Sequence, residues 1–524
     1  LIARAETRLE NQQPIEATKL YRECLDKAGT TGNTKERMGC ACGLGNSLLM
    51  EAAEGAAPAF EDCLALANDL AAANFGGDAL RGLGAIAALG GDTKVAERRY
   101  EDARHRYAQA HQPSGEGQAL VGLGRALHKQ GRNEEARSAL GNALSRFSSL
   151  AKPAPYLGDV EEALGDLDLT EGKAEQARKH YDSARNHFLT AGNVLGNANI
   201  TLQLAELERQ ASAYEASRKL FDDALALYGE VGEDLGRANA LRGIADLELS
   251  QGELEFARQK YAQARDIFLA QHSPGGEGHA LLGLGNVALA GADKPLARQH
   301  YDDARSVFDA ANDLSGTADA LCALAEIDPS DDSAIKLYEQ ARTRAHNARN
   351  AFAECNALVG LARRHEPKPA LATKYLADAE RVCQDAGNLP GRAHVALLTG
   401  KLTGESDGTA ARRHYDAARA LFAQIGDLTG EANVLLELAV LDASEGEHEQ
   451  AAKHFEEARA DYQRSGDSLG EFNVDITEAQ YLTALGRRGD AKRLLERTAE
   501  WASKRGVVQL AGAARRQMAE LGLR

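Results

Sequence analysis

Two stretches decide the fold: GRANALRGIADLELSQGELEFARQKYAQARDIF at Gly236–Phe268 and GEANVLLELAVLDASEGEHEQAAKHFEEARADY at Gly430–Tyr462. Small and aromatic residues fall at the same places in both, so they are copies of one repeat. A bulky residue late in each copy marks the register at spacings of 37 to 41 residues along the whole chain: Tyr21, Phe60, Tyr100, Leu140, Tyr181, Phe221, Tyr261, Tyr301, Tyr338, Tyr375, Tyr415, Phe455 and Leu495. A sustained period of this length is typical of solenoids.

Each repeat reads as two helices. The first is expected to start at a glycine such as Gly236 and to end near a glycine that can adopt the left-handed conformation, such as Gly172, Gly252 or Gly446. The second carries a small, a bulky and another small residue at helical spacing, which lets neighbouring helices approach closely.

The residues Leu284, Gly285, Ala297, Tyr301 and Ala304 resemble the Leu-Gly, Ala, Tyr/Phe and Ala signature of the tetratricopeptide repeat, and the pattern covers essentially the whole chain. The longer, forty-residue form is similar to the repeats of Leu-Gly-Asn-type adaptors and of STAND-class signalling proteins. This resemblance implies an all-α, right-handed superhelical solenoid of about 13 helix-turn-helix repeats with a C-terminal capping helix.

Four segments are expected: a regular array at 1–315 with a truncated first repeat, shortened irregular repeats at 316–390, a regular array at 391–506, and a capping helix at 507–524. Prolines in DPSDD (Asp328–Asp332) and HEPKP (His365–Pro369) should shorten the first helices there. We therefore expect a change of curvature, with weak points at 328–333 and 364–370. Because the chain starts inside a repeat, it is also expected to be a fragment.

Bulk composition narrows the function. A net charge of −17 argues against non-specific nucleic-acid binding, and no apolar run is long enough to cross a membrane. Seven scattered cysteines without a CxxC pair predict reduced, small core residues and a cytoplasmic protein, although the missing start leaves a targeting signal open. The oligomeric state is not indicated.

Catalytic and cofactor motifs are not supported by their context. The glycines of GLGNVALAG (from Gly283) and GLGRALHKQG (from Gly122) lie inside predicted helices, whereas a dinucleotide fingerprint follows a strand. Four histidines precede the register residue at repeat spacing and are expected at the surface: His180, His300, His414 and His454. Arginines at the repeat positions Arg185, Arg265, Arg305 and Arg459 are expected to form exposed pairs with acids three or four residues earlier, namely Asp182, Asp302 and Glu456, whereas Gln263 interrupts the pattern before Arg265. We predict no enzyme, cofactor or metal site.

One polar position persists through eleven first helices, and we call it the first ladder: Asp78, Gln118, Asp159, Asn199, Asn239, His279, Asp319, Asn356, His394, Asn433 and Asn473. In the tetratricopeptide family this position faces the peptide groove, but the residues could equally cross-link neighbouring helices. Seven residues further on lies the second ladder: Arg125, Asp166, Glu206, Asp246, Asn286 and Glu326. The predicted groove thus has an acidic centre, with Arg81, Arg125 and Arg242 as its basic residues.

The sequence therefore predicts a non-catalytic scaffold or adaptor that binds a protein or peptide in its concave groove. The alternative is a sensor or regulatory arm of a larger signalling ATPase or protease whose catalytic domain lies outside this chain.

Overall fold

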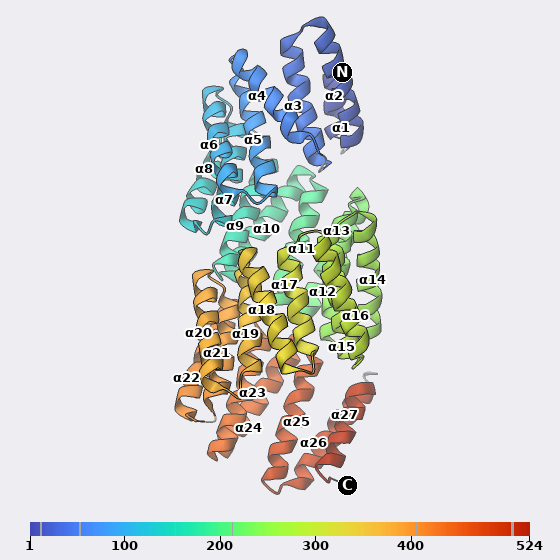
Figure 1. Cartoon of the computed structure of the whole chain (residues 1–524), viewed down its shortest axis with the longest axis vertical. Helices are drawn as coiled ribbons and strands as arrows, with labels where there is room; N and C mark the ends of the chain where they lie inside the picture. The colour runs from blue at the N-terminus through green and yellow to red at the C-terminus, as the bar shows by residue number, and fades with distance from the viewer. Residues whose placement is uncertain are drawn as a thin grey trace. The chain divides into compact units, whose positions relative to one another are not determined.

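The computed structural model describes residues 1–10, 13–51, 54–151, 153–211, 213–404, 406–504 and 508–523. Within these ranges all regular structure is α-helical, and 27 helices pack in consecutive pairs (Figure 1). The predicted all-α array is confirmed. Thirteen hairpins run from α1/α2 to α25/α26, and α27 packs on α26.

The chain divides into two units, residues 1–169 with 175–196 and residues 170–174 with 197–524. Apart from residues 170–174, the first unit holds α1 (Ile2–Glu10), α2 (Pro14–Thr31), α3 (Thr34–Met50), α4 (Ala56–Asp69), α5 (Ala73–Leu89), α6 (Thr93–Gln109), α7 (Pro113–Lys129), α8 (Asn133–Ser148), α9 (Ala154–Thr170) and α10 (Ala174–Ala191).

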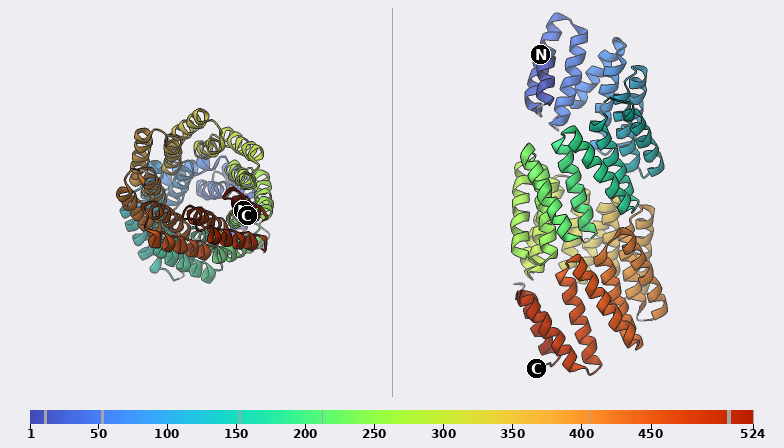
Figure 2. Two further views of the ribbon diagram at one scale, coloured as in Figure 1. Left: turned by 90° about the horizontal axis from the view of Figure 1, so that it is seen from below. Right: turned by 180° about the vertical axis from the view of Figure 1, so that it is seen from behind.

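The second unit begins within α11 (Val194–Gln210) and continues through α12 (Tyr214–Val231), α13 (Asp234–Ser250), α14 (Leu254–Ala270), α15 (Pro274–Ala290), α16 (Lys294–Ala310), α17 (Leu314–Ile327), α18 (Asp331–Asn347), α19 (Ala351–Arg364), α20 (Pro369–Asp385), α21 (Leu389–Gly404), α22 (Gly408–Ile425), α23 (Leu428–Glu445), α24 (His448–Ser465), α25 (Ser468–Ala484), α26 (Arg488–Lys504) and α27 (Val508–Glu520). Its hairpins follow one another in chain order, from green to red in Figure 2. Residue 507, the expected start of the capping helix, lies outside the described residues.

Consecutive first helices contact one another directly in the second unit, as α13 does α15 and α15 does α17. The row of first helices from α11 to α25 is called the first-helix face below. Close spacing of one helix row is typical of the inside of a curved array, which is where the first ladder is expected to lie.

Helix ends follow local chemistry. The predicted left-handed glycines are confirmed, with φ of 72°, 77° and 81° at Gly172, Gly252 and Gly446. The first helices, however, begin two residues before the glycines that were expected to start them. In α23, for example, the Asp427 carboxylate caps the helix by accepting from the Gly430 backbone N–H at 2.8 Å.

Glycines inside the first helices make room for aromatic rings. In α15, a Cβ at Gly283 would lie less than 3 Å from the ring of Tyr261 in the preceding hairpin, and one at Gly285 would overlap Tyr301 of its own hairpin. Interiors pack too densely to absorb such an overlap without movement. The GLG motif therefore seats two aromatic rings, which accounts for its recurrence without any nucleotide.

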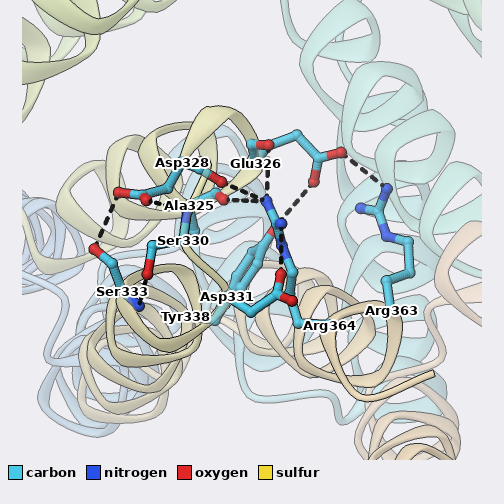
Figure 3. A network of polar contacts seen from close by, with 9 residues as sticks. All are labelled: Ala325, Glu326, Asp328, Ser330, Asp331, Ser333, Tyr338, Arg363 and Arg364. Carbon is cyan, nitrogen blue, oxygen red and sulfur yellow. Dashed lines mark hydrogen bonds and ion pairs between the residues drawn. The ribbon is translucent and has the colours of Figure 1, made fainter. Parts of the chain in front are cut away.

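The two shortened first helices are confirmed, since α17 and α19 span 14 residues each. Figure 3 shows the turn after α17, where Arg364 donates to the carbonyls of Ala325, Glu326 and Asp328 at 2.8, 3.0 and 3.3 Å. On the other side of the same turn, Asp328 accepts from the Ser330 backbone N–H at 2.9 Å. These bonds argue against the weak point expected at 328–333. The proposed domain limits and the change of curvature stay predictions.

The expectation of unpaired core cysteines is wrong for six of the seven. Three disulfides join Cys24 to Cys40, Cys42 to Cys63 and Cys355 to Cys383, with Cα–Cα distances of 5.9, 5.2 and 6.2 Å. Each pair lies on adjacent helices of the array, which widely scattered spacing in the sequence could not reveal. Among the described helices, none is long and apolar enough to span a membrane.

Candidate functional site: the polar first-helix face

Residues of the first ladder reach solvent although their immediate neighbours are buried. Asn199 of α11 is exposed between Ala198 and Ile200, both 0% exposed. The same contrast holds at His279, Asn356, His394 and Asn433, whereas Asn239 and Asp319 are half-buried. The ladder is therefore an accessible polar stripe on the first-helix face of the second unit.

In several hairpins, an aromatic residue of the second helix determines which atoms of the ladder side chain remain available. Where that residue is a tyrosine, its hydroxyl donates to the ladder oxygen: Tyr228 to Asn199 at 2.8 Å and Tyr462 to Asn433 at 2.7 Å. Because the amide oxygen is then engaged, the NH₂ group is what remains for a ligand. Both predicted roles of the ladder are therefore compatible: the amide oxygen links two helices, and the NH₂ group of the same side chain stays available to a ligand.

Where the aromatic residue is a phenylalanine, it has no hydroxyl that could donate a hydrogen bond to the ladder residue. His279 and His394 instead lie edge-on to Phe308 and Phe422, with ring centroids 5.2 Å apart in both pairs. In each histidine Nδ1 is within hydrogen-bonding distance of a backbone carbonyl, that of Gly275 at 2.7 Å and that of Pro390 at 2.9 Å. The other ring nitrogen is the one left for a ligand.

The second ladder is largely engaged within the protein. Tyrosine hydroxyls donate to Asp166, Asn286 and Glu326 at 2.7, 2.6 and 2.7 Å, and Tyr261 donates to Asp246. Glu206 is bound by Arg209. These acceptors orient the register tyrosines. The acidic residues predicted for the centre of the groove therefore act mainly as hydrogen-bond partners within the fold.

Three predicted site residues meet in one hollow. Asn239, Arg242 and His279 line a space of about 350 Å³ between α13 and α15, together with Leu235, Phe268, Ser273 and Gly276. In the part of the chain that the structure describes, the side chains of Asn239 and Arg242 have no hydrogen-bond partner. The hollow therefore combines free polar groups with an apolar wall, the usual composition of a binding site.

Burial changes the acidity of this face. It raises the pKa of Asp319 to about 6, and neighbouring His279 partly opposes the rise. Burial also raises the pKa of Asp246, against the hydrogen bond from Tyr261 and the charge of Arg242. Both carboxyls are thus crowded into surroundings that disfavour their charged forms.

The remaining predicted basic residues belong to the first unit. Arg125 of α7 pairs with Glu162 at 2.8 Å. Arg81 of α5 lies beside Asp78, which accepts from Tyr107 at 2.6 Å, and its Nε is buried without a partner among the described atoms. Asp166 lies in this unit too, so the predicted residues are divided between the two units.

Sequence reasoning missed a recurrent ion pair between hairpins. An arginine that follows the small residue of one second helix binds a buried acid near the end of the next first helix: Arg137 with Asp168 at 2.8 Å, Arg218 with Glu248 at 3.1 Å, Arg298 with Asp328 at 3.1 Å and Arg412 with Asp442 at 2.6 Å. Acidic residues that recur at forty-residue spacing near otherwise apolar helix ends could have indicated these ion pairs.

Two expectations about charged side chains are corrected. The four repeat histidines are half-buried rather than surface residues, and His180 and His454 bind Glu161 and Asp442 at 2.6 Å each. Arg265 and Arg305 do pair on their own helices, but with Asp266 and Asp309, which follow the arginine in sequence. Arg459 instead binds Asp475 and Glu478 of the next helix, α25. For Arg459, acids on the adjacent helix compete with Glu456 for the guanidinium group.

Comparison with known proteins identifies part of the array. The tetratricopeptide repeat family model matches residues 197–270. This tetratricopeptide stretch covers α11 to α14 and contains Asn199, Asn239 and Arg242. No match was found among curated proteins.

Several solved structures match parts of the chain at low sequence identity. BtubC (BKLC) from P. vanneervenii is 20% identical, with a TM-score of 0.37 over 42% of this chain and 90% of that one. A Rap protein complexed with competence and sporulation factor is 12% identical, with a TM-score of 0.47 over 67% and 99%. Aspartyl phosphate phosphatase F from Bacillus subtilis is 13% identical, with a TM-score of 0.39 over 71% and 90%. At these values the likeness says nothing about function.

Proposed function

We propose that this chain is a non-catalytic repeat protein that binds a protein or peptide segment along the first-helix face of its second unit. The observation that supports the proposal is the hollow between α13 and α15, where Asn239 and Arg242 keep unused hydrogen-bonding groups. Solvent-facing polar groups that the fold itself does not use are available to a partner.

The chemistry of the hollow suits an extended segment. The Asn239 amide can donate to and accept from a peptide backbone, and Arg242 can donate to a carbonyl or carboxylate. Phe268 and Leu235, which is 37% exposed, offer apolar contact to a side chain of the same segment. Repetition of the ladder along the face lets modest contacts add over a long ligand.

Site-specific photocrosslinking tests where the partner lies. A photoreactive residue at Leu235 should crosslink the native partner, whereas one at Leu89, which is 77% exposed on α5, should not. Equal crosslinking from both positions would contradict a site on this face.

Substitution then separates binding from stability. Losing one or two hydrogen bonds in Asn239→Ala should weaken partner binding by about 0.5–3 kcal/mol, while stability holds or rises because Ala is the better helix former. Ser217→Ala is the matched control, since it removes a buried hydroxyl of α12 that donates to the Ala205 carbonyl at 2.7 Å and not to a ladder residue, and it should lower stability with little effect on affinity. Unchanged partner affinity in Asn239→Ala would refute the proposal.

A further inference from the structure

The last two hairpins lack the ion pair between hairpins that is formed at four earlier junctions. In α22 to α24, Arg412 binds the buried Asp442 at 2.6 Å and Glu445 at 2.8 Å, and His454 binds the second oxygen of Asp442 at 2.6 Å. Forty residues later the corresponding positions hold Ala452, Leu482, Leu485 and Leu494. A whole cluster of charged side chains is thereby replaced by apolar ones.

The replacement leaves an open space. A hollow of about 560 Å³ lies between α24, α25 and α26, with Ala452, Leu482 and Leu494 in its lining. Tyr481 and Phe455 form an aromatic wall, their ring centroids 5.9 Å apart, and Leu485 is 39% exposed. Ala452 stands where the preceding hairpin has Arg412, so the hollow lies beside the place of a missing long side chain.

The charge of the lining is reversed as well. Glu447 and Glu457 correspond by the same offset to Arg487 and Arg497, and Arg493 adds a third guanidinium group. Arg487 and Arg493 share the single carboxylate of Asp490, and their side chains are 60% and 75% exposed. Exposed pairs of this kind are weak and exchange readily.

Arg497 completes the basic lining. It has no ion pair among the residues that the structure describes, and it lines this hollow together with Arg487 and Arg493. The chain as a whole carries a charge of −17, but charges beyond about 8 Å are largely screened at physiological salt. The local excess of arginine therefore decides what approaches this hollow.

We propose that the hollow between α24, α25 and α26 binds an acidic peptide segment of a partner protein through one large apolar side chain flanked by carboxylates. The apolar side chain fills the space above Ala452 and contacts Tyr481 and Leu485. The flanking carboxylates pair with Arg487, Arg493 and Arg497, for which guanidinium forks are well suited. This site lies between the second helices α24 and α26 and the end of α25, contains no residue of the first ladder, and does not depend on the function proposed for the first-helix face.

Fluorescence anisotropy with a labelled peptide of Asp and Glu around a central Phe-Leu pair tests the proposal on the full chain. The wild type should bind it saturably, and replacing the Phe-Leu pair by Ser should weaken binding about tenfold. Arg487→Glu with Arg497→Glu, which restores the charges of the preceding hairpin, should weaken binding by about tenfold or more. Arg258→Glu with Arg265→Glu on α14 makes the same change of net charge elsewhere and should leave binding unchanged.

A second variant separates occupancy from charge. Ala452→Arg fills the hollow without removing a cation and should also abolish binding. Asn239→Ala should bind the peptide as the wild type does, so failure of either site is recognised separately. The proposal is overturned if the peptide fails to bind, if both double variants weaken it equally, or if the arginines are needed only for phosphatidylserine vesicles or for self-association in sedimentation.

Discussion

The seating of aromatic rings on glycines gives the sharpest test of how the array is held together. Gly283→Ala in α15 places a methyl group less than 3 Å from three atoms of the Tyr261 ring, which is 1% exposed and so enclosed on all sides. Overpacking of this kind costs about 3 kcal/mol at the upper end of its range, and the gain in helix propensity returns about 1 kcal/mol. We expect a net loss of about 2 kcal/mol.

The control lies on the same helix. A Cβ at Gly275 meets nothing within 4 Å, so Gly275→Ala should leave stability unchanged or raise it by up to about 1 kcal/mol. Hydrogen exchange measured by mass spectrometry is the right assay, because a repeat array opens locally rather than in one cooperative step. Faster exchange should be confined to α14, α15 and their neighbours in Gly283→Ala.

A methyl group does occur at the corresponding position one repeat later. The equivalent of Gly283 one repeat later is Ala323, so a hairpin spaced for it can hold a methyl group beside Tyr301. In α15 the helix would have to move away from α14 and lose packing there. If Gly283→Ala exchanges no faster than Gly275→Ala, the hairpins adjust freely and the ring contact does not fix their spacing.

Three further outcomes follow from the described contacts. Asp319→Asn should raise stability above pH 6 by about 1–2 kcal/mol and have no effect near pH 4. Burial raises the pKa of this carboxyl on folding, so the wild type loses stability as the pH rises from about 4 through 6. Equal effects of the substitution in thermal melts at both pH values would contradict this. Arg364→Ala removes the guanidinium that caps α17 and should lower local stability by about 2–3 kcal/mol. Limited proteolysis should then cut at 328–333 earlier in the variant than in the wild type, and identical cleavage would show that the cap is dispensable. Phe268→Tyr should place a hydroxyl beside Asn239 and weaken partner binding by about 0.5–1.5 kcal/mol with stability retained, and unchanged affinity would show that the Asn239 oxygen contacts no ligand.

The architecture could be predicted from the sequence because the repeat consists of residue types whose packing roles are clear. The small and aromatic residues at forty-residue spacing predicted hairpins, and Gly252 and Gly446 marked their ends with positive φ as expected. Periodicity cannot state which helix faces which, since that depends on contacts between residues far apart in the chain. For this reason the sequence did not predict that Cys42 meets Cys63 or that Arg412 reaches Asp442.

The candidate site was predicted in position but not in chemistry. The first ladder was recognisable because a polar residue recurred between apolar ones, and Asn239, Arg242 and His279 do line one hollow. The engagement of the second ladder was missed, since nothing in the spacing of Asp246 shows that the Tyr261 hydroxyl from another helix will reach it. Whether a polar side chain is free or engaged is decided by the partner helix.

That dependence gives the second helices control over the first-helix face. A tyrosine at 228 or 462 engages the oxygen of Asn199 or Asn433 and leaves an amide donor. A phenylalanine at 268 leaves both the donor and the acceptor of Asn239 available. The two residue types are close to equivalent for packing against glycine, so a Tyr/Phe exchange in a second helix can alter what the face presents while the hairpin is preserved. A fixed scaffold can in this way vary its polar pattern from repeat to repeat, through buried residues that a ligand never touches.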